Sequence, residues 1–295
     1  MGVVIKATGI SADVSLHDSV EHAVRAGSAC IDAAGIDRND IGLVLNVGIY
    51  RNDNIVEPAN ASLVQNRLEI NPKYVKGSTS FSFDILNGAC GFLNAAQVAG
   101  AVLRTTDVRY VLIVSSDVHP SKEKVVDFPY RNIGAAALLE WSDDLQRGFQ
   151  EIIFRTSRNG QGGLESIVDL SVPGARGNVQ VKQSESYHEH LIDFTARMVT
   201  DVCEEHKGRH DLRSDDIIFV TSQPVRDFTL RVIETAGMGG KSLEYLYEKY
   251  GDPHSSTLTI AYHEGKASGD IEPGDQVVFV GAGAGLTASV GFYLE

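Results

Sequence analysis

The sequence predicts an α/β fold in which a central, largely parallel sheet is covered by helices on both faces. Short apolar runs rich in β-branched residues, at 41–47, 111–114 and 277–280, have the length of fully buried strands. Longer stretches with helical spacing of apolar residues separate these runs, and this alternation is typical of α/β proteins. The size agrees, because 295 residues with 43% hydrophobic and 22% charged residues can bury a substantial core.

The remaining elements follow in chain order. Apolar spacing predicts a helix at 20–34, a strand at 81–86 and a helix rich in small residues at 91–103. The Gly- and Ser-rich segment at 159–178 is predicted to be a long excursion from the fold, a loop that forms either a lid or a dimer contact. A further strand is expected at 217–220.

An internal repeat divides the chain. The strand that starts at Ile41 returns at Ile217, an offset of 176 residues, and the strand at Val111 returns at Val277, an offset of 166. Two similar offsets predict two related α/β halves, residues 1–145 and 146–295, with chance similarity between amphipathic units as the alternative.

Charge and composition exclude several functions. The 26 Lys and Arg stand against 39 Asp and Glu, a net charge of −13, and no basic run could follow a phosphate backbone, so nucleic acid is not an expected partner. No apolar stretch approaches the roughly 20 residues of a membrane span. Three scattered cysteines make no disulfide framework, which indicates a reducing, cytoplasmic setting.

Cys90 lies where the strand at 81–86 gives way to the helix at 91–103. A thiol at a helix N-terminus faces free backbone N–H groups and the positive end of the helix dipole, which lowers its pKa and makes it a candidate nucleophile. The alternative is a small buried apolar residue. Cys30 and Cys203 lie on helices and are expected to be structural.

The region around Cys90 resembles the nucleophile region of ketoacyl-ACP synthase III, in the thiolase superfamily. Similar segments follow along almost the whole chain: residues 82–92, 111–117, 134–139, the Gly-Asp-Pro-His-Ser-Ser run at 251–256, and the glycine-rich turn at 281–287. The resemblance implies a thiolase-like fold of two related α/β halves with central mixed sheets covered by helices. It also implies an acyltransferase of fatty acid or polyketide-type biosynthesis, with no permanently bound cofactor and an acyl-coenzyme A or acyl carrier protein thioester as substrate.

The sequence departs from this family at each catalytic position. Family enzymes use Cys, His and Asn, but here Cys90 directly precedes the Gly-Phe pair, so that Ala89 falls where the nucleophile is expected. Either the turn re-forms and Cys90 points into the pocket, or the site has no nucleophile. Ser222 stands at the His position and is no base near neutral pH, and Asp252 replaces the Asn and cannot donate a hydrogen bond when ionised.

His254 offers a replacement imidazole. It follows Asp252 by two residues, and if its side chain turns inward, Asp252 or Ser222 would orient it in a rewired Cys-His-Asp site; a histidine in a surface loop is the alternative. Backbone N–H groups of Gly283 and Gly285 are candidates for an oxyanion hole. His188 and His190 flank Glu189, but no complete set of metal ligands accompanies them, and no metal is expected.

The family's arm that grips coenzyme A is also missing, because residues 10–15 pass almost directly into the first helix. A carrier-bound pantetheine or a partner subunit would then complete the entrance. Two hypotheses follow: an acyltransferase that carries the acyl group on Cys90 and passes it to an unknown acceptor, or a non-catalytic ketosynthase-like subunit paired with an active partner. Family members pair across the strand after the nucleophile helix, which predicts a homodimer or heterodimer contact around residues 111–115.

Overall fold

A computed structural model describes residues 2–73, 80–120, 128–157, 163–168, 179–206, 216–243 and 245–295. The strands are β1 (Val3–Ser11), β2 (Ile41–Asn46), β3 (Phe81–Asp84), β4 (Tyr110–Asp117), β5 (Ile133–Trp141), β6 (Gly148–Thr156), β7 (Leu164–Val168), β8 (Val179–Gln183), β9 (Ile217–Thr221), β10 (Lys241–Ser242), β11 (Gln276–Gly283) and β12 (Thr287–Leu294). The α-helices are α1 (Ser19–Ala34), α2 (Asn60–Arg67), α3 (Gly91–Thr105), α4 (Tyr187–His206), α5 (Phe228–Ala236), α6 (Tyr245–Tyr250) and α7 (Thr257–Ser268). Short 3₁₀ turns are η1 (Arg38–Asp40), η2 (Asn52–Asn54), η3 (Gly88–Cys90) and η4 (His254–Ser256).

The main sheet has ten strands in the order β10-β9-β11-β12-β6-β1-β5-β4-β2-β3. It is mixed: β2 runs parallel to β3 and β4, and β9 runs parallel to β10 and β11, whereas the strands between them pair antiparallel. The α/β class and the mixed strand directions expected from the resemblance are confirmed. The largely parallel sheet expected from the apolar runs is wrong, because five of the nine strand pairs in this sheet are antiparallel. The expected separate sheets are instead one continuous sheet, because β1 pairs with β6 at Val3 and Phe149.

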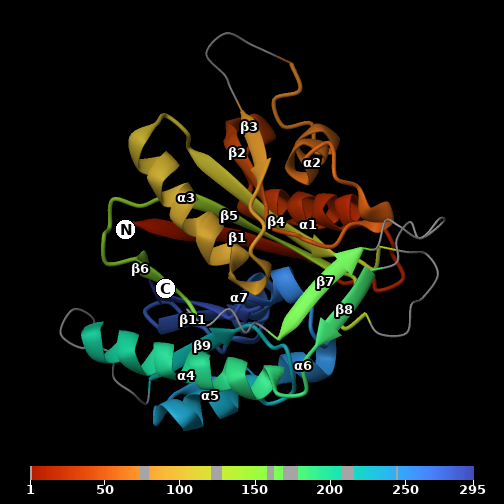
Figure 1. The fold of residues 1–295 in the computed structure, drawn as a ribbon. Coiled ribbons are helices and arrows are strands. Elements are labelled where there is room, and N and C mark those ends of the chain that lie inside the picture. Colours follow the sequence, from red (N-terminus) through yellow and green to blue (C-terminus); the bar gives the residue numbers. More distant parts are fainter. Residues whose placement is uncertain are drawn as a thin grey trace.

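Helices form three layers around this sheet (Figure 1). The helices α1 and α2 pack on the outer face of β2, β4 and β5, and α4 and α5 pack on the outer face of β9, β11 and β12. Between them, α3 and α7 contact strands from both halves of the sheet. In strand β4, successive side chains point to opposite faces of the sheet and so pack against different helix layers. Val111 and Ile113 face the central helices, while Leu112 and Val114 face α1.

The strand order has an internal correspondence. Outward from the paired strands β1 and β6, the two sides of the sheet follow the same order. On each side an antiparallel strand comes first (β5 or β12), then two parallel strands (β4 and β2, or β11 and β9), and last a short edge strand (β3 or β10). This order is the one that two related halves would give, and the division between residues 145 and 146 stays a prediction. Of the expected excursion at 159–178, β7 is described and pairs with β8, while residues 159–162 and 169–178 lie outside the described residues.

The predicted dimer strand is wrong. Residues 111–115 lie in β4, and both edges of β4 are already paired within the chain, to β2 and β5. A strand with both edges occupied has no free N–H and C=O groups for a second chain. On this side of the sheet, β3 is the edge strand among the strands that the structure describes.

Candidate active site

A small cavity of about 40 Å³ lies where the starts of α3 and α7 meet the ends of β9 and β11. Its walls include Ala89, Tyr130, Ser222, Asp252, His254 and Gly283. The structure therefore brings together Ser222, Asp252, His254 and Gly283, which the sequence analysis singled out from three separate segments.

Cys90 lies behind the cavity wall. Its side chain is buried, and its thiol donates a hydrogen bond to the Thr287 carbonyl at 3.7 Å, while the preceding residue, Ala89, lines the cavity. Burial raises the pKa of the Cys90 thiol to about 11, the opposite of the expected direction, because loss of solvent outweighs the helix N-terminus. The cavity is therefore lined by Ala89 and not by Cys90, which is the second of the two arrangements that the sequence left open. Cys90 as an acyl carrier stays a prediction, and this placement counts against it.

The two 3₁₀ turns beside the cavity share a backbone conformation. Gly88 begins η3 with φ = 49°, and His254 begins η4 with φ = 50°. A left-handed conformation is ordinary for glycine, but for histidine it is an uncommon conformation that the surrounding contacts must hold in place. The two turns face each other, since a Cβ added to Gly88 would lie 3.1 Å from His254 Nε2.

His254 is oriented by Asp117, at the end of β4. The Nδ1 atom of His254 lies 3.2 Å from Asp117 Oδ2, and the two side chains are 14% and 0% exposed. Burial lowers the pKa of His254, but the charge and hydrogen bond of Asp117, with a contribution from Asp252, raise it overall. Burial would raise the pKa of Asp117, yet His254 and the hydrogen bonds it accepts hold that pKa below its ordinary value. The pair is thus a buried Asp–His dyad whose Nε2 faces Gly88.

Asp252 and Ser222 hold the cavity wall, and neither bonds to the His254 imidazole. Asp252 Oδ1 accepts a hydrogen bond from the His254 backbone N–H at 2.7 Å, and burial raises the pKa of Asp252 to about 6. The Ser222 hydroxyl accepts from the Ala282 N–H at 2.9 Å. Both residues therefore stabilise turns, and the expectation that Asp252 or Ser222 orients the imidazole does not match the observed bonds.

The glycine-rich turn contributes a wall of backbone. Gly283 lines the cavity, and a Cβ placed on it would lie 3.9 Å from the Ala89 backbone nitrogen. Gly285 has φ = 106° and forms the turn between β11 and β12, and it is not among the described residues that line the cavity. The oxyanion role of both glycines stays a prediction.

The expectation about metal concerns the start of α4. His188 lines the cavity and contacts the Gln183 amide at 3.2 Å, whereas His190 is exposed. Within the described ranges, no group of three or more His, Cys, Asp or Glu side chains is arranged to hold a metal ion. In the described part of the chain, no helix is long and apolar enough to cross a membrane.

Sequence reasoning missed two residues that complete the site. Asp117 ends a strand in the sequence Ser-Ser-Asp, and a charged residue closing an apolar strand is a usable signal, but its partner 137 residues away is set by tertiary structure. Tyr130 stacks on the His254 ring with centroids 4.1 Å apart and lies in a loop without any periodicity.

Comparisons with known proteins agree with this architecture. Residues 208–293 match the family described as 3-oxoacyl-[acyl-carrier-protein] synthase III C terminal. The β-ketoacyl-[acyl-carrier-protein] synthase III 1 of Bacillus anthracis is 26% identical over 287 residues, covering 95% of this chain and 85% of its own. The β-ketoacyl-[acyl-carrier-protein] synthase III of Clostridium beijerinckii is 23% identical, over 89% of this chain and 80% of its own.

Solved structures show the same fold. A 3-oxoacyl-[acyl-carrier-protein] synthase III from Aquifex aeolicus superposes with a TM-score of 0.76 at 16% identity, covering all of both chains. OleA of Xanthomonas campestris, with bound lauric acid and lauroyl-CoA, gives 0.78 at 16% identity over 100% of this chain and 99% of its own. The fold is thus that of thiolase-like proteins. Within that class, the chain is a ketoacyl-ACP synthase III-like protein, and the names of its relatives place this type among the acyltransferases.

Proposed function

We propose that this protein is an acyltransferase that moves an acyl group from a thioester directly to an acceptor, with His254 as the general base and without an acyl group on Cys90. One observation carries the proposal: the cavity has Ala89 at the nucleophile position and, facing that turn, a histidine held by a buried carboxylate. A histidine whose Nδ1 is fixed by a carboxylate is the arrangement that general-base catalysis requires.

The proposed step needs no nucleophile on the protein. An acceptor hydroxyl or amine attacks the thioester carbonyl while His254 Nε2 takes its proton, the new C–O or C–N bond forms, and the C–S bond then breaks. The imidazolium returns the proton to the leaving thiolate, so the products are an ester or amide and a free thiol. This reaction involves no decarboxylation, so an Asp in place of the family's Asn does not prevent it.

The oxyanion of this step would lie between Gly283 and the start of α3. The Ala89 N–H and the backbone of Gly283 are neighbours there, and the positive end of a helix adds to their effect. Gly285 would act indirectly, by holding the turn that presents Gly283.

We propose that the thioester enters through a larger cleft of about 570 Å³ that shares Tyr130 and Asp252 with the cavity. Its lining includes Arg131, Arg226 and Lys249, of which Arg226 pairs with Glu248 and Lys249 with Glu264. Cations at this mouth suit the phosphate of a pantetheine arm, on coenzyme A or on an acyl carrier protein, despite the net negative charge of the chain. No permanently bound cofactor is needed.

The test measures thiol release from a panel of acyl-coenzyme A and acyl-carrier thioesters, together with the intact mass of the protein. We expect Cys90→Ala to keep the wild-type rate and His254→Ala to lose about 100-fold or more. His263→Ala is the matched control, because His263 lies on α7, bonds Thr8 at 2.8 Å and does not line the cavity. An acyl adduct that disappears in Cys90→Ala would overturn the proposal and make Cys90 the carrier.

A second candidate is the non-catalytic subunit of a ketosynthase-like pair, and the open edge of the sheet favours it. Edge strand β3 begins with Phe81, which is 48% exposed, and an unpaired edge is a template for a strand of a second chain. Phe81→Asp would then abolish a dimer seen by size-exclusion chromatography with light scattering, and Leu145→Asp, equally apolar and 60% exposed, would not. A pair with a different chain, joined to a lack of thiol release by this chain alone, would favour this candidate over the first.

A further inference from the structure

The segment between β2 and α2 holds the carboxylate that orients His254. The backbone N–H groups of Ile49 and Tyr50 donate to Asp117 Oδ1 at 2.9 and 2.7 Å. The other oxygen, Asp117 Oδ2, points toward the η4 turn, where it accepts a hydrogen bond from the Ser255 N–H and faces His254 Nδ1. The two oxygens thus divide between this segment and the η4 turn, and the direction of the carboxylate depends on both.

The same segment packs against the imidazole. The Tyr50 ring lies 5.4 Å from the His254 ring and 5.1 Å from the Tyr130 ring, and its hydroxyl bonds Ser166 of β7 at 2.6 Å. Tyr50 therefore contributes a side-chain wall as well as a backbone hydrogen bond.

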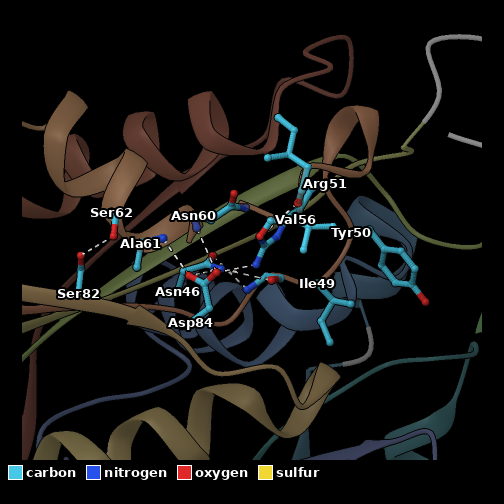
Figure 2. Close-up of polar contacts among 12 residues, drawn as sticks. Asn46, Ile49, Tyr50, Arg51, Val56, Asn60, Ala61, Ser62, Ser82 and Asp84 are labelled. Atoms are coloured by element: carbon cyan, nitrogen blue, oxygen red, sulfur yellow. Dashed lines mark hydrogen bonds and ion pairs between the residues drawn. The ribbon is translucent and has the colours of Figure 1, made fainter. Parts of the chain in front are cut away.

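The next residue, Arg51, anchors the segment on the opposite side. Its guanidinium lies 2.5 Å from Asp84 Oδ2, with the two side chains 9% and 11% exposed, and it also donates to the Ile55 and Val56 carbonyls (Figure 2). The arginine therefore closes the loop onto itself and ties it to the end of β3.

Asp84 is bonded on every side. Its carboxylate accepts from the backbone N–H groups of Asn60 and Ala61, at 3.0 and 2.9 Å, which are the first residues of α2, and from the Asn46 amide of β2 at 3.3 Å (Figure 2). This carboxylate joins β2, β3, α2 and the segment that carries Arg51 at one point.

We infer that Arg51 and Asp84 are positioning residues for the His254 site, since they fix the segment whose Ile49 and Tyr50 hold Asp117. A buried ion pair contributes little net stability, because desolvation of both charges offsets their attraction. Its consequence here is geometric: residues 49 and 50 are adjacent to Arg51, so a shift of the arginine moves the two N–H groups that aim Asp117. This inference rests on the proposed function of His254.

The test compares Arg51→Met with Arg51→Lys and with Arg38→Met as a matched control. Arg38 is a half-buried arginine, less buried than Arg51, and it bonds the Leu68 carbonyl and Ser28 away from the site. The first readout is the pKa of His254, measured by NMR titration of the imidazole in the substrate-free protein. The groups that face His254 are Asp117, Asp252, Tyr50 and Tyr130. Asp117 contributes most to raising the His254 pKa, so a loss of the Asp117 contact would appear in this titration as a lower pKa.

We expect Arg51→Met to lower the His254 pKa by about one unit, and the rate of thiol release by about 100-fold through kcat more than through KM. Arg51→Lys, which keeps the charge, should recover part of both effects, and Arg38→Met should change neither. If Arg51→Met does not fold, Asp84→Asn replaces it, because its amide oxygen can still accept from one of the two α2 N–H groups while the charge pairing with Arg51 is lost.

The outcomes separate this inference from the proposed function. An unchanged His254 pKa in both Arg51→Met and Asp84→Asn would overturn the inference, whether or not His254→Ala is inactive. A lowered pKa together with full activity of His254→Ala would support the positioning role and overturn the general-base proposal instead.

Discussion

Asp117→Asn is the sharpest test of the dyad, because the substitution keeps shape and volume and removes one charge and one acceptor. Each Asp117 oxygen accepts from at least one backbone N–H: Ile49 and Tyr50 on Oδ1, and Ser255 on Oδ2. An asparagine amide has one oxygen and one NH₂ group, so on one side it must place a donor against a donor.

The magnitude follows from this geometry. If the amide oxygen keeps Ile49 and Tyr50, its NH₂ faces Ser255 and His254, and one buried N–H loses its acceptor at a cost of about 1–3 kcal/mol. The NH₂ group then donates to His254 Nδ1, which moves the imidazole proton to Nε2, the atom that the reaction needs free. At 3.2 Å and an effective dielectric constant of about 20, the lost ion pair has a ceiling of about 5 kcal/mol. We therefore expect the His254 pKa to fall by about one to three units, and kcat to fall by about 10⁴-fold, as for an Asp→Asn change behind other catalytic histidines.

The assay is thiol release at saturating thioester, with the His254 titration and the thermal unfolding midpoint measured on the same preparation. A folded Asp117→Asn protein with kcat within about threefold of wild type would refute the assignment of His254 as base, since a wrong tautomer costs far more than that. Reduced activity with an unchanged His254 pKa would show that the carboxylate does not act through the imidazole.

Three further predictions concern the same cavity. Ala89→Cys should place a thiol in the cavity and acquire an acyl mass from acyl-coenzyme A in intact-mass spectra; the wild type should give no such adduct on Cys90, which lies outside the cavity lining and whose pKa burial raises to about 11. In the wild type the rate should rise with pH through the raised pKa of His254, because the base form predominates above it; Asp252→Asn removes a nearby negative charge and should move this inflection to lower pH in a pH–rate profile. Gly88→Ala puts a Cβ 3.1 Å from His254 Nε2 on a residue whose φ is 49°. It should lower the free energy of unfolding by about 1–2 kcal/mol, seen as a lower thermal unfolding midpoint, and it should reduce activity.

The elements could be predicted because their signals are local. The strand at Val111 and the helix at 91–103 follow from apolar runs of the right length and period, and the structure places β4 and α3 there. The arrangement of the strands could not be predicted in the same way. The same buried run at 111–115 is compatible with an edge or an interior strand, and only its pairing to β2 and β5 excludes a dimer contact there.

The candidate site could also be predicted only in part, as far as its signals are local in the sequence. Glycines and substitutions at family positions indicated which segments meet, and Ser222, Asp252 and His254 do line one cavity. Which side chain of the Ala89–Cys90 pair faces the cavity depends on a rotation of about 120° per residue in the 3₁₀ turn η3, which the sequence left open. The partner of His254 depended on where β4 ends relative to α7, and Asp117 was therefore missed.

The conformation of His254 gives a separate reason to assign it a role. The turns η3 and η4 precede the two central helices α3 and α7, and each begins with a left-handed residue. At the first turn the residue is Gly88, which adopts φ = 49° without steric cost. At the second it is His254, for which a left-handed conformation costs on the order of 1–2 kcal/mol that a glycine there would avoid. That cost is offset by the bonds to Asp117 and the stack on Tyr130, which hold the imidazole in the cavity wall. A histidine kept in this conformation, facing a turn that presents alanine instead of a nucleophile, favours a site whose chemistry depends on the imidazole.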